Sequence, residues 1–203
     1  PAEHKVVRTG NMKGGIFIPI QFSYLACVKT DGFWRMTVNY HKLSQAVTSI
    51  AVALPDVVPL LKPINTSLGN NMAAIDLVNA FLSIPVHKAH QKQFAFIWQG
   101  QQYTFTVILW GYIYSLVLRH NLVGKDLGCI SFPQDITLVH YIDDIMLIGP
   151  SSEHELATTL DLLVRHLCVR PWEINSTKIQ VPFTSVTFLG SSGVGHVKIS
   201  LLR

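Results

Sequence analysis

Hydrophobic residues along the chain fall into short runs, and most of the runs have the length or the period of β-strands. Residues 72–76, MAAID, predict a buried strand. Residues 93–109 alternate aromatic and polar positions on both sides of residues 99–102, which predicts a β-hairpin. The first 70 residues are rich in Gly, Pro and short strand-like runs, and Asp56 marks the start of a possible short helix over residues 57–61.

Two later segments have the period of a helix. Residues 112–127 place apolar positions at helical spacing, with Gly124 against the prediction. This stripe consists of Leu116, His120, Val123 and Leu127. A second helix is predicted to follow Ser152, because Ser152 and Glu155 form the S-x-x-E pattern of a capping box. Its apolar stripe consists of Leu156, Leu160, Leu163, Val164 and Leu167, and Pro171 ends it.

The order of these elements mixes strands and helices without strict βαβ alternation. Short strands return in residues 178–190, after the second helix. The pattern therefore predicts an α+β domain, in which an antiparallel sheet has helices on one face.

Composition narrows the class of protein. Hydrophobic residues make up 49% of the 203 residues and charged residues 14%, which permits a sizeable core. The mean hydropathy is +0.33, but Pro or Asp interrupts the apolar stretches before the roughly 18 residues that a membrane-spanning helix needs. Three widely spaced cysteines predict neither a disulfide framework nor a zinc site. Without a signal-peptide pattern we expect an intracellular protein, and the net charge of +4 is compatible with a nucleic-acid partner.

The most informative stretch is ITLVHYIDDIMLIG, residues 136–149, in which Asp143 and Asp144 lie between two apolar runs. Burying an unpaired charge is costly, and burying two like charges side by side costs more. One interpretation is a hairpin turn, because Asp favours turns and the flanking runs make two matched arms. Asp76 ends the apolar run of residues 72–76 in similar company. The chain has only 12 acidic residues, so three of them embedded in apolar sequence favour a functional site.

The chemistry of three converging carboxylates requires a positive charge among them, because they would otherwise repel one another. Oxygen ligands favour a hard cation, Mg²⁺ or Mn²⁺, and no Cys/His cluster indicates zinc. Two such ions about 3.5–4 Å apart can activate an attacking oxygen and stabilise a leaving one. The pattern therefore predicts metal-assisted phosphoryl transfer, which requires Asp76 to lie within about 10 Å of Asp143. A structural Ca²⁺ site is the alternative, although no D-x-D-x-D-G loop supports it.

Tyr-Ile-Asp-Asp at residues 141–144 resembles the Y-x-D-D signature of reverse transcriptases, and the resemblance covers nearly the whole chain. FWRMTVNYHKLSQ resembles the fingers segment of that family, and AAIDLVNAFLSIPVH its first catalytic motif. QFAFIWQGQQYTFTVILWGY resembles the fingers-to-palm hairpin, while WEINSTKIQ and FLG resemble the closing strands of the palm. The chain looks most like a pol polyprotein fragment of a gammaretrovirus-like endogenous retrovirus.

This resemblance implies one incomplete reverse transcriptase domain over residues 1–203, with the right-hand architecture of polymerases. Residues 1–51 and 84–114 would form the fingers, and residues 52–83 and 115–190 the palm, whose end would be residues 191–203. The thumb, connection and RNase H portions of a larger polyprotein would be missing.

The resemblance also assigns roles to individual residues. Asp76, Asp143 and Asp144 would be catalytic and would bind metal, together with the backbone carbonyl of Leu77. The residues assigned to the incoming nucleotide are Lys29, Arg35, Asn79, Ala80, Phe81 and Trp110. The residues assigned to the primer and template are Tyr141, Lys178, Phe188, Leu189 and Gly190.

The implied activity is that of an RNA-directed DNA polymerase. It would transfer nucleotides from dNTPs to a primer 3′-hydroxyl on an RNA or DNA template, with two Mg²⁺ ions, or Mn²⁺, as cofactors. Some positions depart from the family pattern L-P-Q-G, since Leu109 takes the place of its Pro and Trp110 that of its Gln. These departures favour an alternative hypothesis, a catalytically inactive retroviral remnant that at most binds nucleic acid or a protein. A retrotransposon polymerase with the same palm chemistry is a third hypothesis.

Overall fold

The computed structural model describes part of the chain and divides it into two compact units. The described residues are 6–8, 24–28, 34–47, 56, 59, 71–78, 83–99, 101–109, 111–149, 152–183, 185–188 and 197–200. The first unit comprises residues 1–51 and 81–115, and the second comprises residues 52–80 and 116–203. Each unit is described by itself below.

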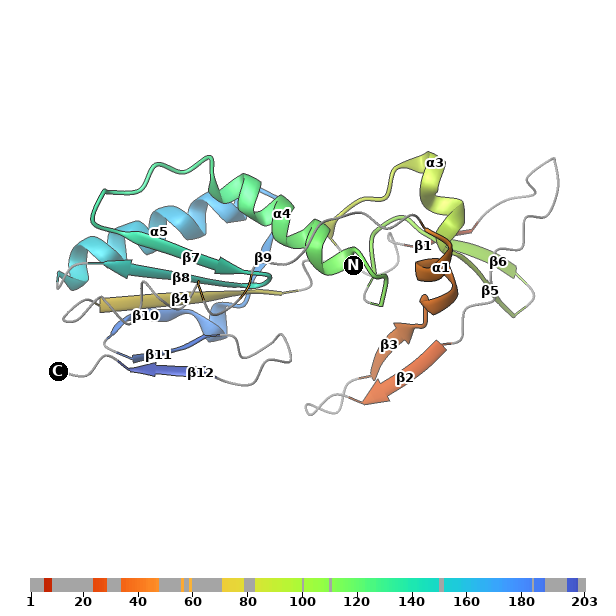
Figure 1. Cartoon of the computed structure of the whole chain (residues 1–203), viewed down its shortest axis with the longest axis horizontal. Coiled ribbons are helices and arrows are strands. Elements are labelled where there is room, and N and C mark those ends of the chain that lie inside the picture. The colour runs from red at the N-terminus through yellow and green to blue at the C-terminus, as the bar shows by residue number, and fades with distance from the viewer. Residues whose placement is uncertain are drawn as a thin grey trace. The chain divides into compact units, whose positions relative to one another are not determined.

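In the first unit the described residues form two small antiparallel sheets and three short helical segments (Figure 1). One sheet has the order β1 (Val6–Arg8), β6 (Gln101–Phe105), β5 (Ala95–Trp98), and the other pairs β2 (Tyr24–Val28) with β3 (Trp34–Val38). The helical segments are α1 (His41–Ala46), α3 (Lys88–Gln91) and the 3₁₀ turn η3 (Lys92–Phe94). Val38, Tyr40, Leu43, Phe94 and Phe105 form its described core.

The second unit is built around an antiparallel sheet whose strands differ in length (Figure 1). The strand order is β10 (Gln180–Phe183), β4 (Asn71–Val78), β8 (Asp144–Gly149), β7 (Thr137–Tyr141), and the two-residue β9 (Glu173–Ile174) pairs with the far end of β4. β11 (Ser185–Phe188) pairs with β12 (Val197–Ser200). The described residues of this unit also form two long helices, α4 (Ser115–Leu127) and α5 (Glu153–Cys168), and the 3₁₀ turn η4 (Ser176–Lys178).

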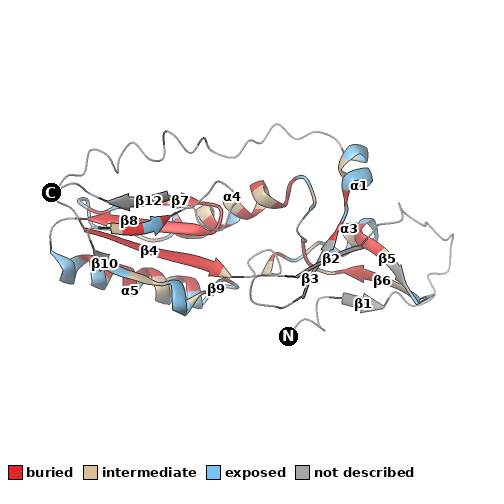
Figure 2. Ribbon diagram, turned by 90° about the horizontal axis from the view of Figure 1, so that it is seen from below, coloured by how far each residue is buried: buried red, intermediate tan, exposed pale blue. Residues whose placement is uncertain are grey.

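The two central strands are buried on both faces, as Figure 2 shows for β4 and β8. Because side chains alternate along a strand, Met72, Ala74, Met146 and Ile148 share one face, and they pack in one cluster with Phe188 of β11. The opposite face packs against α5, which contacts β4, β8 and β10. The central strands are therefore sandwiched, which accounts for their continuous apolar sequence.

Helix α5 follows the predicted stripe: Leu156, Leu160, Leu163 and Leu167 are buried. The capping-box prediction is wrong in one respect. Ser152 is the N-cap residue, but its side chain makes no capping hydrogen bond, and the acidic Glu153 and Glu155 in the first turn instead complement the helix dipole.

The predicted fold class is confirmed: the structure is mixed α+β, with antiparallel sheets and helices. The predicted strand of residues 72–76 lies within β4, and the predicted hairpin of residues 93–109 is the pair β5–β6. The helix predicted over residues 112–127 begins later, at Ser115. Most of residues 57–61 lie outside the described residues. Within the part of the chain that is described, no helix is long and apolar enough to cross a membrane.

Candidate active site at the ends of β4 and β8

Asp76 and Asp144 face each other across neighbouring strands. The antiparallel register of β4 and β8 pairs Asp76 directly with Asp144. Opposite residues in such a pair have Cβ atoms about 4.5–5.5 Å apart, and like charges there are destabilising. By strand alternation both side chains lie on the face of Met72 and Met146, and both are buried. The sheet thus brings together two acids that are 68 positions apart in the sequence (144 − 76).

Asp143 belongs to the tight turn between β7 and β8. Its backbone carbonyl accepts a hydrogen bond of 2.9 Å from the N–H of Leu77, so Asp143 lies beside the end of β4. Ile142 in the same turn has a φ of 55°, a left-handed conformation that is uncommon for a β-branched residue. The segment therefore forms the predicted hairpin turn, and the turn also brings its acids next to Asp76. The predicted proximity of Asp76 to Asp143 is confirmed.

Two histidines hold the strained turn. The N–H of Ile142 donates to Nδ1 of His120 at 3.3 Å, and Nε2 of His140 lies 3.1 Å from the carbonyl oxygen of Ile142. With the proton on Nε2, His140 donates this second bond. The two imidazole rings stack with centroids 4.4 Å apart. Both polar backbone groups of Ile142 thus have a partner, which satisfies the backbone at a buried turn.

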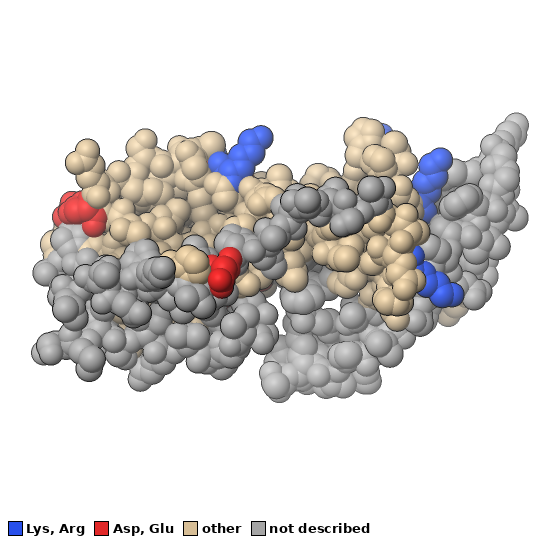
Figure 3. Space-filling view, in the orientation of Figure 1, with Lys and Arg blue, Asp and Glu red and all other residues tan. Residues whose placement is uncertain are grey.

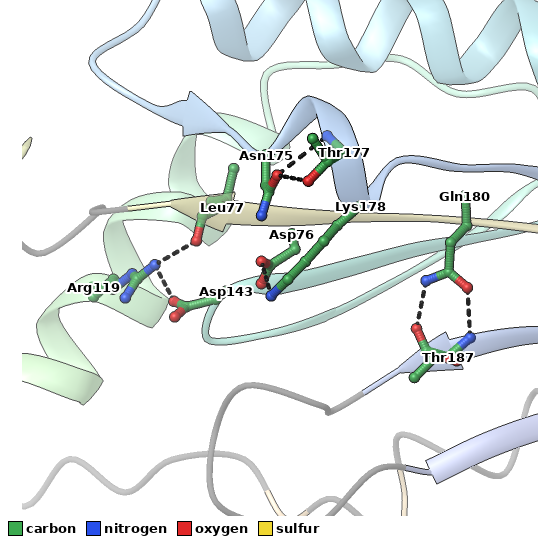
Figure 4. A network of polar contacts seen from close by, with 9 residues as sticks. All are labelled: Asp76, Leu77, Arg119, Asp143, Asn175, Thr177, Lys178, Gln180 and Thr187. Atoms are coloured by element: carbon green, nitrogen blue, oxygen red, sulfur yellow. Dashed lines mark hydrogen bonds and ion pairs between the residues drawn. The ribbon is translucent and has the colours of Figure 1, made fainter. Parts of the chain in front are cut away.

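Each of two carboxylates is paired with a basic residue of the chain (Figure 4). Nζ of Lys178 lies 2.8 Å from Oδ2 of Asp76. Arg119 of α4 forms an ion pair with the carboxylate of Asp143, and it also donates to the backbone carbonyl of Leu77 at 3.4 Å. Arg119 is 2% exposed, whereas the side chain of Lys178 is 53% exposed.

Local backbone structure positions Lys178. Asn175 caps the turn η4, because its Oδ1 accepts from the N–H of Thr177 at 3.2 Å. The N–H of Asn175 donates to the carbonyl of Asp76 at 2.9 Å, which fixes η4 against β4. Beyond η4, Gln180 donates to and accepts from the backbone of Thr187 (Figure 4), so its side chain links β10 to β11.

The ionisation of the acids reflects their burial. Burial raises the pKa of Asp143 to about 6, an effect that Arg119 opposes and Asp76 strengthens. Burial, together with the neighbouring charges of Asp76 and Asp143, raises the pKa of Asp144 to about 7. Oδ2 of Asp144 is buried and has no hydrogen-bond partner. An unpartnered buried carboxylate oxygen indicates a site that a cation would stabilise.

The donor chemistry of the acids suits a hard divalent cation, but their arrangement does not. Among the described residues, no group of three or more His, Cys, Asp or Glu side chains is arranged to hold a metal ion. The physical reason is the two basic residues, since Lys178 engages Asp76 and Arg119 engages Asp143 and Leu77. The predicted magnesium site therefore does not fit this arrangement.

The remaining predicted residues fall into two groups. Tyr141 ends β7 opposite Asp144 and is buried, and Phe188 is buried in the cluster beneath β4 and β8. The backbone of Arg35 lies in β3, and its side chain is not described. The other predicted residues, which lie outside the described part of the chain, are Lys29, Asn79, Ala80, Phe81, Trp110, Leu189 and Gly190. Their roles stay predictions.

Sequence reasoning missed Arg119, His120 and His140 as members of the site. A signal for Arg119 was available, because it lies four residues before the buried Val123 on an apolar helix, and a buried Arg needs a carboxylate partner. His120 was assigned only to the apolar stripe. No spacing in the sequence indicates that His140 and His120 meet, since strand β7 and helix α4 come together only in the fold.

Basic residues do not gather into a patch on the face of the molecule in Figure 3. The described surface there is mostly uncharged, and its Lys and Arg side chains lie apart from one another.

Comparisons with known proteins agree with the geometry. The sequence model of the family described as reverse transcriptase (RNA-dependent DNA polymerase) matches residues 27–192. The Gag-Pol polyprotein of walleye dermal sarcoma virus is 30% identical over 157 residues, which are 77% of this chain and 9% of that protein. The Pol polyprotein of feline endogenous virus ECE1 is 31% identical over 123 residues, which are 57% of this chain and 12% of that protein.

Solved structures show the same fold. The foamy viral protease-reverse transcriptase in complex with double-stranded DNA superposes with a TM-score of 0.72 at 25% identity, over 93% of this chain and 36% of that one. The same enzyme in complex with an RNA/DNA hybrid gives a TM-score of 0.71 at 24% identity, over 92% and 23%. The chain thus spans only a small part of the length of each polyprotein and about a quarter to a third of each solved chain.

Proposed function

Because the chain belongs to the reverse transcriptase family, a family of nucleotidyltransferases, we propose that it forms the fingers and palm of an RNA-directed DNA polymerase. The proposed reaction is the transfer of a nucleotide from a dNTP to a primer 3′-hydroxyl on an RNA or DNA template. The chain is related to retroviral pol polyproteins. Its descent from a gammaretrovirus-like endogenous virus is part of the proposal, supported by the similarity to the Pol polyprotein of feline endogenous virus ECE1.

The observation that carries the proposal is the pairing of Asp76 with Asp144 beside the Asp143 turn. Two acids held directly opposite each other in a sheet destabilise the fold. Such unfavourable arrangements are typical of functional sites, and phosphoryl transfer is a reaction that uses paired acids. In this proposal Asp76, Asp143 and Asp144 are the catalytic acids. The first compact unit corresponds to the fingers and the second to the palm, which is consistent with their composition from discontinuous segments.

The proposal extends to the nucleotide and the primer. Lys29, Arg35, Asn79, Ala80, Phe81 and Trp110 are proposed to contact the dNTP. Tyr141, Lys178, Phe188, Leu189 and Gly190 are proposed to position the primer and template. For Tyr141 and Phe188, whose side chains are buried, the proposed role is to shape the site from beneath rather than to touch nucleic acid.

The family implies divalent metal ions, and the proposed cofactors are two Mg²⁺, with Mn²⁺ as a substitute. In the structure Arg119 and Lys178 are paired with Asp143 and Asp76, so metal binding requires these carboxylates to be released.

Primer extension tests the proposal directly. The chain is incubated with a labelled primer on an RNA template and on a DNA template, with dNTPs and either Mg²⁺ or Mn²⁺. The matched variant is Asp144→Asn, which keeps the shape of the side chain and removes its charge. The expected result is metal-dependent extension that disappears in the variant. Equal background from both proteins would reject polymerase activity for this chain.

A second candidate function is a non-catalytic domain that binds a primer–template without extending it. The ion pairs of Arg119 and Lys178 with the acids favour it, because they neutralise the carboxylates without a metal. Fluorescence anisotropy with the same primer–template separates the two candidates. Binding without extension supports the second, and extension that Asp144→Asn abolishes supports the first.

A further inference from the structure

Arg119 contacts two oxygen groups that the resemblance to reverse transcriptases assigns to metal. Its guanidinium is paired with the carboxylate of Asp143 and donates to the carbonyl of Leu77 (Figure 4). Arg119 reaches them from α4, whereas the oxygens belong to β4 and the β7–β8 turn. A single side chain thus joins three segments at the point where the acids converge.

Because Arg119 is buried, its ion pair with Asp143 is difficult to replace by a metal ion. Arg119 is 2% exposed, and a guanidinium stays protonated in proteins. If Arg119 moved away while remaining inside, both the guanidinium and the carboxylate would be buried without a counter-charge, which is strongly unfavourable. Lys178 differs, because its half-exposed side chain can turn into solvent without a comparable loss.

The geometry of a guanidinium also competes with that of a metal. Mg²⁺ requires near-octahedral oxygen ligands at about 2.0–2.1 Å and gives up its waters reluctantly. An N–H donor directed at the same oxygens occupies the space and the lone pairs that such an ion needs. Arg119 and Lys178 together also reduce the charge of three ionised carboxylates from −3 to −1 (−3 + 2), which weakens the attraction for a divalent ion.

We propose that the guanidinium of Arg119 takes the place of one metal ion at the acids. It neutralises part of their negative charge, so the chain binds divalent metal weakly. The inference rests on the proposed function for the identity of the oxygen ligands. The inference goes beyond the proposed function because it names one residue of this chain, Arg119, that controls metal binding.

Metal binding, rather than polymerase activity, provides the test. Mn²⁺ is titrated into the 203-residue chain, and free Mn²⁺ is measured by electron paramagnetic resonance. Arg119→Met removes the charge and keeps the length of the side chain. Arg165→Met is the matched control, because Arg165 is 78% exposed and pairs with Asp161 on the surface of α5. We expect Arg119→Met to bind Mn²⁺ about tenfold or more tightly than the native chain, and Arg165→Met to match the native chain.

Thermal unfolding with and without Mn²⁺ provides the second readout. Mn²⁺ should raise the melting temperature of Arg119→Met and leave that of the native chain nearly unchanged. The double variant Arg119→Gln/Asp143→Asn removes both buried charges, so it avoids the unpaired carboxylate of the single variant. It should fold but gain no Mn²⁺ affinity, since the contested ligand is lost.

Two results would overturn the inference. One is a native chain that binds two Mn²⁺ ions at micromolar concentrations, a measurement that does not depend on the folding of any variant. The other is equal Mn²⁺ affinity in the native chain, Arg119→Met and Arg165→Met. If Arg119→Met binds Mn²⁺ but extends no primer, the inference about Arg119 stands and the proposed polymerase function fails. If the native chain binds Mn²⁺ tightly and extends a primer, the proposed function stands and the inference about Arg119 fails.

Discussion

At the scale of single residues, the position of Asp144 in the sheet destabilises the fold. It is buried directly opposite Asp76, and its Oδ2 has no hydrogen-bond partner. We predict that Asp144→Asn raises the free energy of unfolding in the absence of metal by about 1–3 kcal/mol, because it removes the repulsion and an unsatisfied buried charge. Chemical denaturation followed by circular dichroism measures the change.

The control for this prediction is Asp161→Asn on the exposed face of α5, where the acid pairs with Arg165. An exposed ion pair contributes little, so a change within about 0.5 kcal/mol is expected there. A loss of stability in Asp144→Asn would mean that the carboxylate has stabilising contacts beyond those described.

His140 makes the fold sensitive to acid. Burial, with a smaller contribution from the neighbouring His120 and Arg119, lowers its pKa from 6.5 to about 4. The unfolded chain therefore binds the proton more readily, so stability is complete above pH 6.5 and decreases as the pH falls towards 4. The difference between these two pKa values corresponds to a loss of about 3 kcal/mol.

The comparison of the native chain with His140→Gln isolates this contribution, because the raised pKa values of Asp143 and Asp144 act in the opposite direction in both proteins. A Gln amide can still donate to the carbonyl of Ile142, but it does not titrate. The difference in unfolding free energy between the two proteins, measured by urea denaturation from pH 7.5 to 4.5, should change with pH. A constant difference would contradict the assignment.

At the scale of elements, the contact between β8 and α5 depends on a glycine. A Cβ at Gly149 would lie 3.1 Å from Cδ1 of Leu156 and 3.2 Å from Cγ1 of Ile136, and both neighbours are buried. We predict that Gly149→Ala destabilises the protein by about 1–2 kcal/mol, because two side chains from different elements would have to shift. Gly128→Ala is the control, since a Cβ there would lie 3.4 Å from the backbone oxygen of Gly124 and 3.5 Å from that of Lys125. Thermal unfolding of the two variants measures the difference, and equal stability would show that the packing adapts.

The elements that local sequence determines could be predicted, and the contacts between distant elements could not. The run of residues 72–76 and the leucine stripe of α5 have unambiguous periods, and both elements form as expected. The pairing of Asp76 with Asp144 depends on strand register, which is set by how two fully buried strands pack between α5 and β11. Ser152 shows the limit even of a local rule, because its position at the helix start is correct and its hydrogen bond is absent.

The apolar sequence around Asp76 indicated the third acid, and the family resemblance then assigned the three acids to one metal site. It also supplied expectations that this chain modifies. The same motifs predicted a site ready for metal, whereas the fold pairs Asp143 with Arg119. Carboxylates attract whichever cation the chain brings near them, and a motif taken alone does not reveal a basic residue on another element.

At the scale of the whole molecule, the proposed binding of nucleic acid predicts a moderate dependence on salt. The formal net charge is +4, and the described residues on the face in Figure 3 do not form a basic patch. If the chain neutralises about three phosphates of a duplex, the logarithm of its affinity should fall with the logarithm of salt concentration with a slope of about −2.7. Between 50 and 200 mM salt this slope gives a loss of about 40-fold, against about 10³–10⁵ for proteins that make 6–10 phosphate contacts. Fluorescence anisotropy with a primer–template duplex across this range measures the slope. A slope steeper than about −5 would contradict the prediction and would mean that the chain concentrates its positive charge on the duplex far more than its net charge indicates.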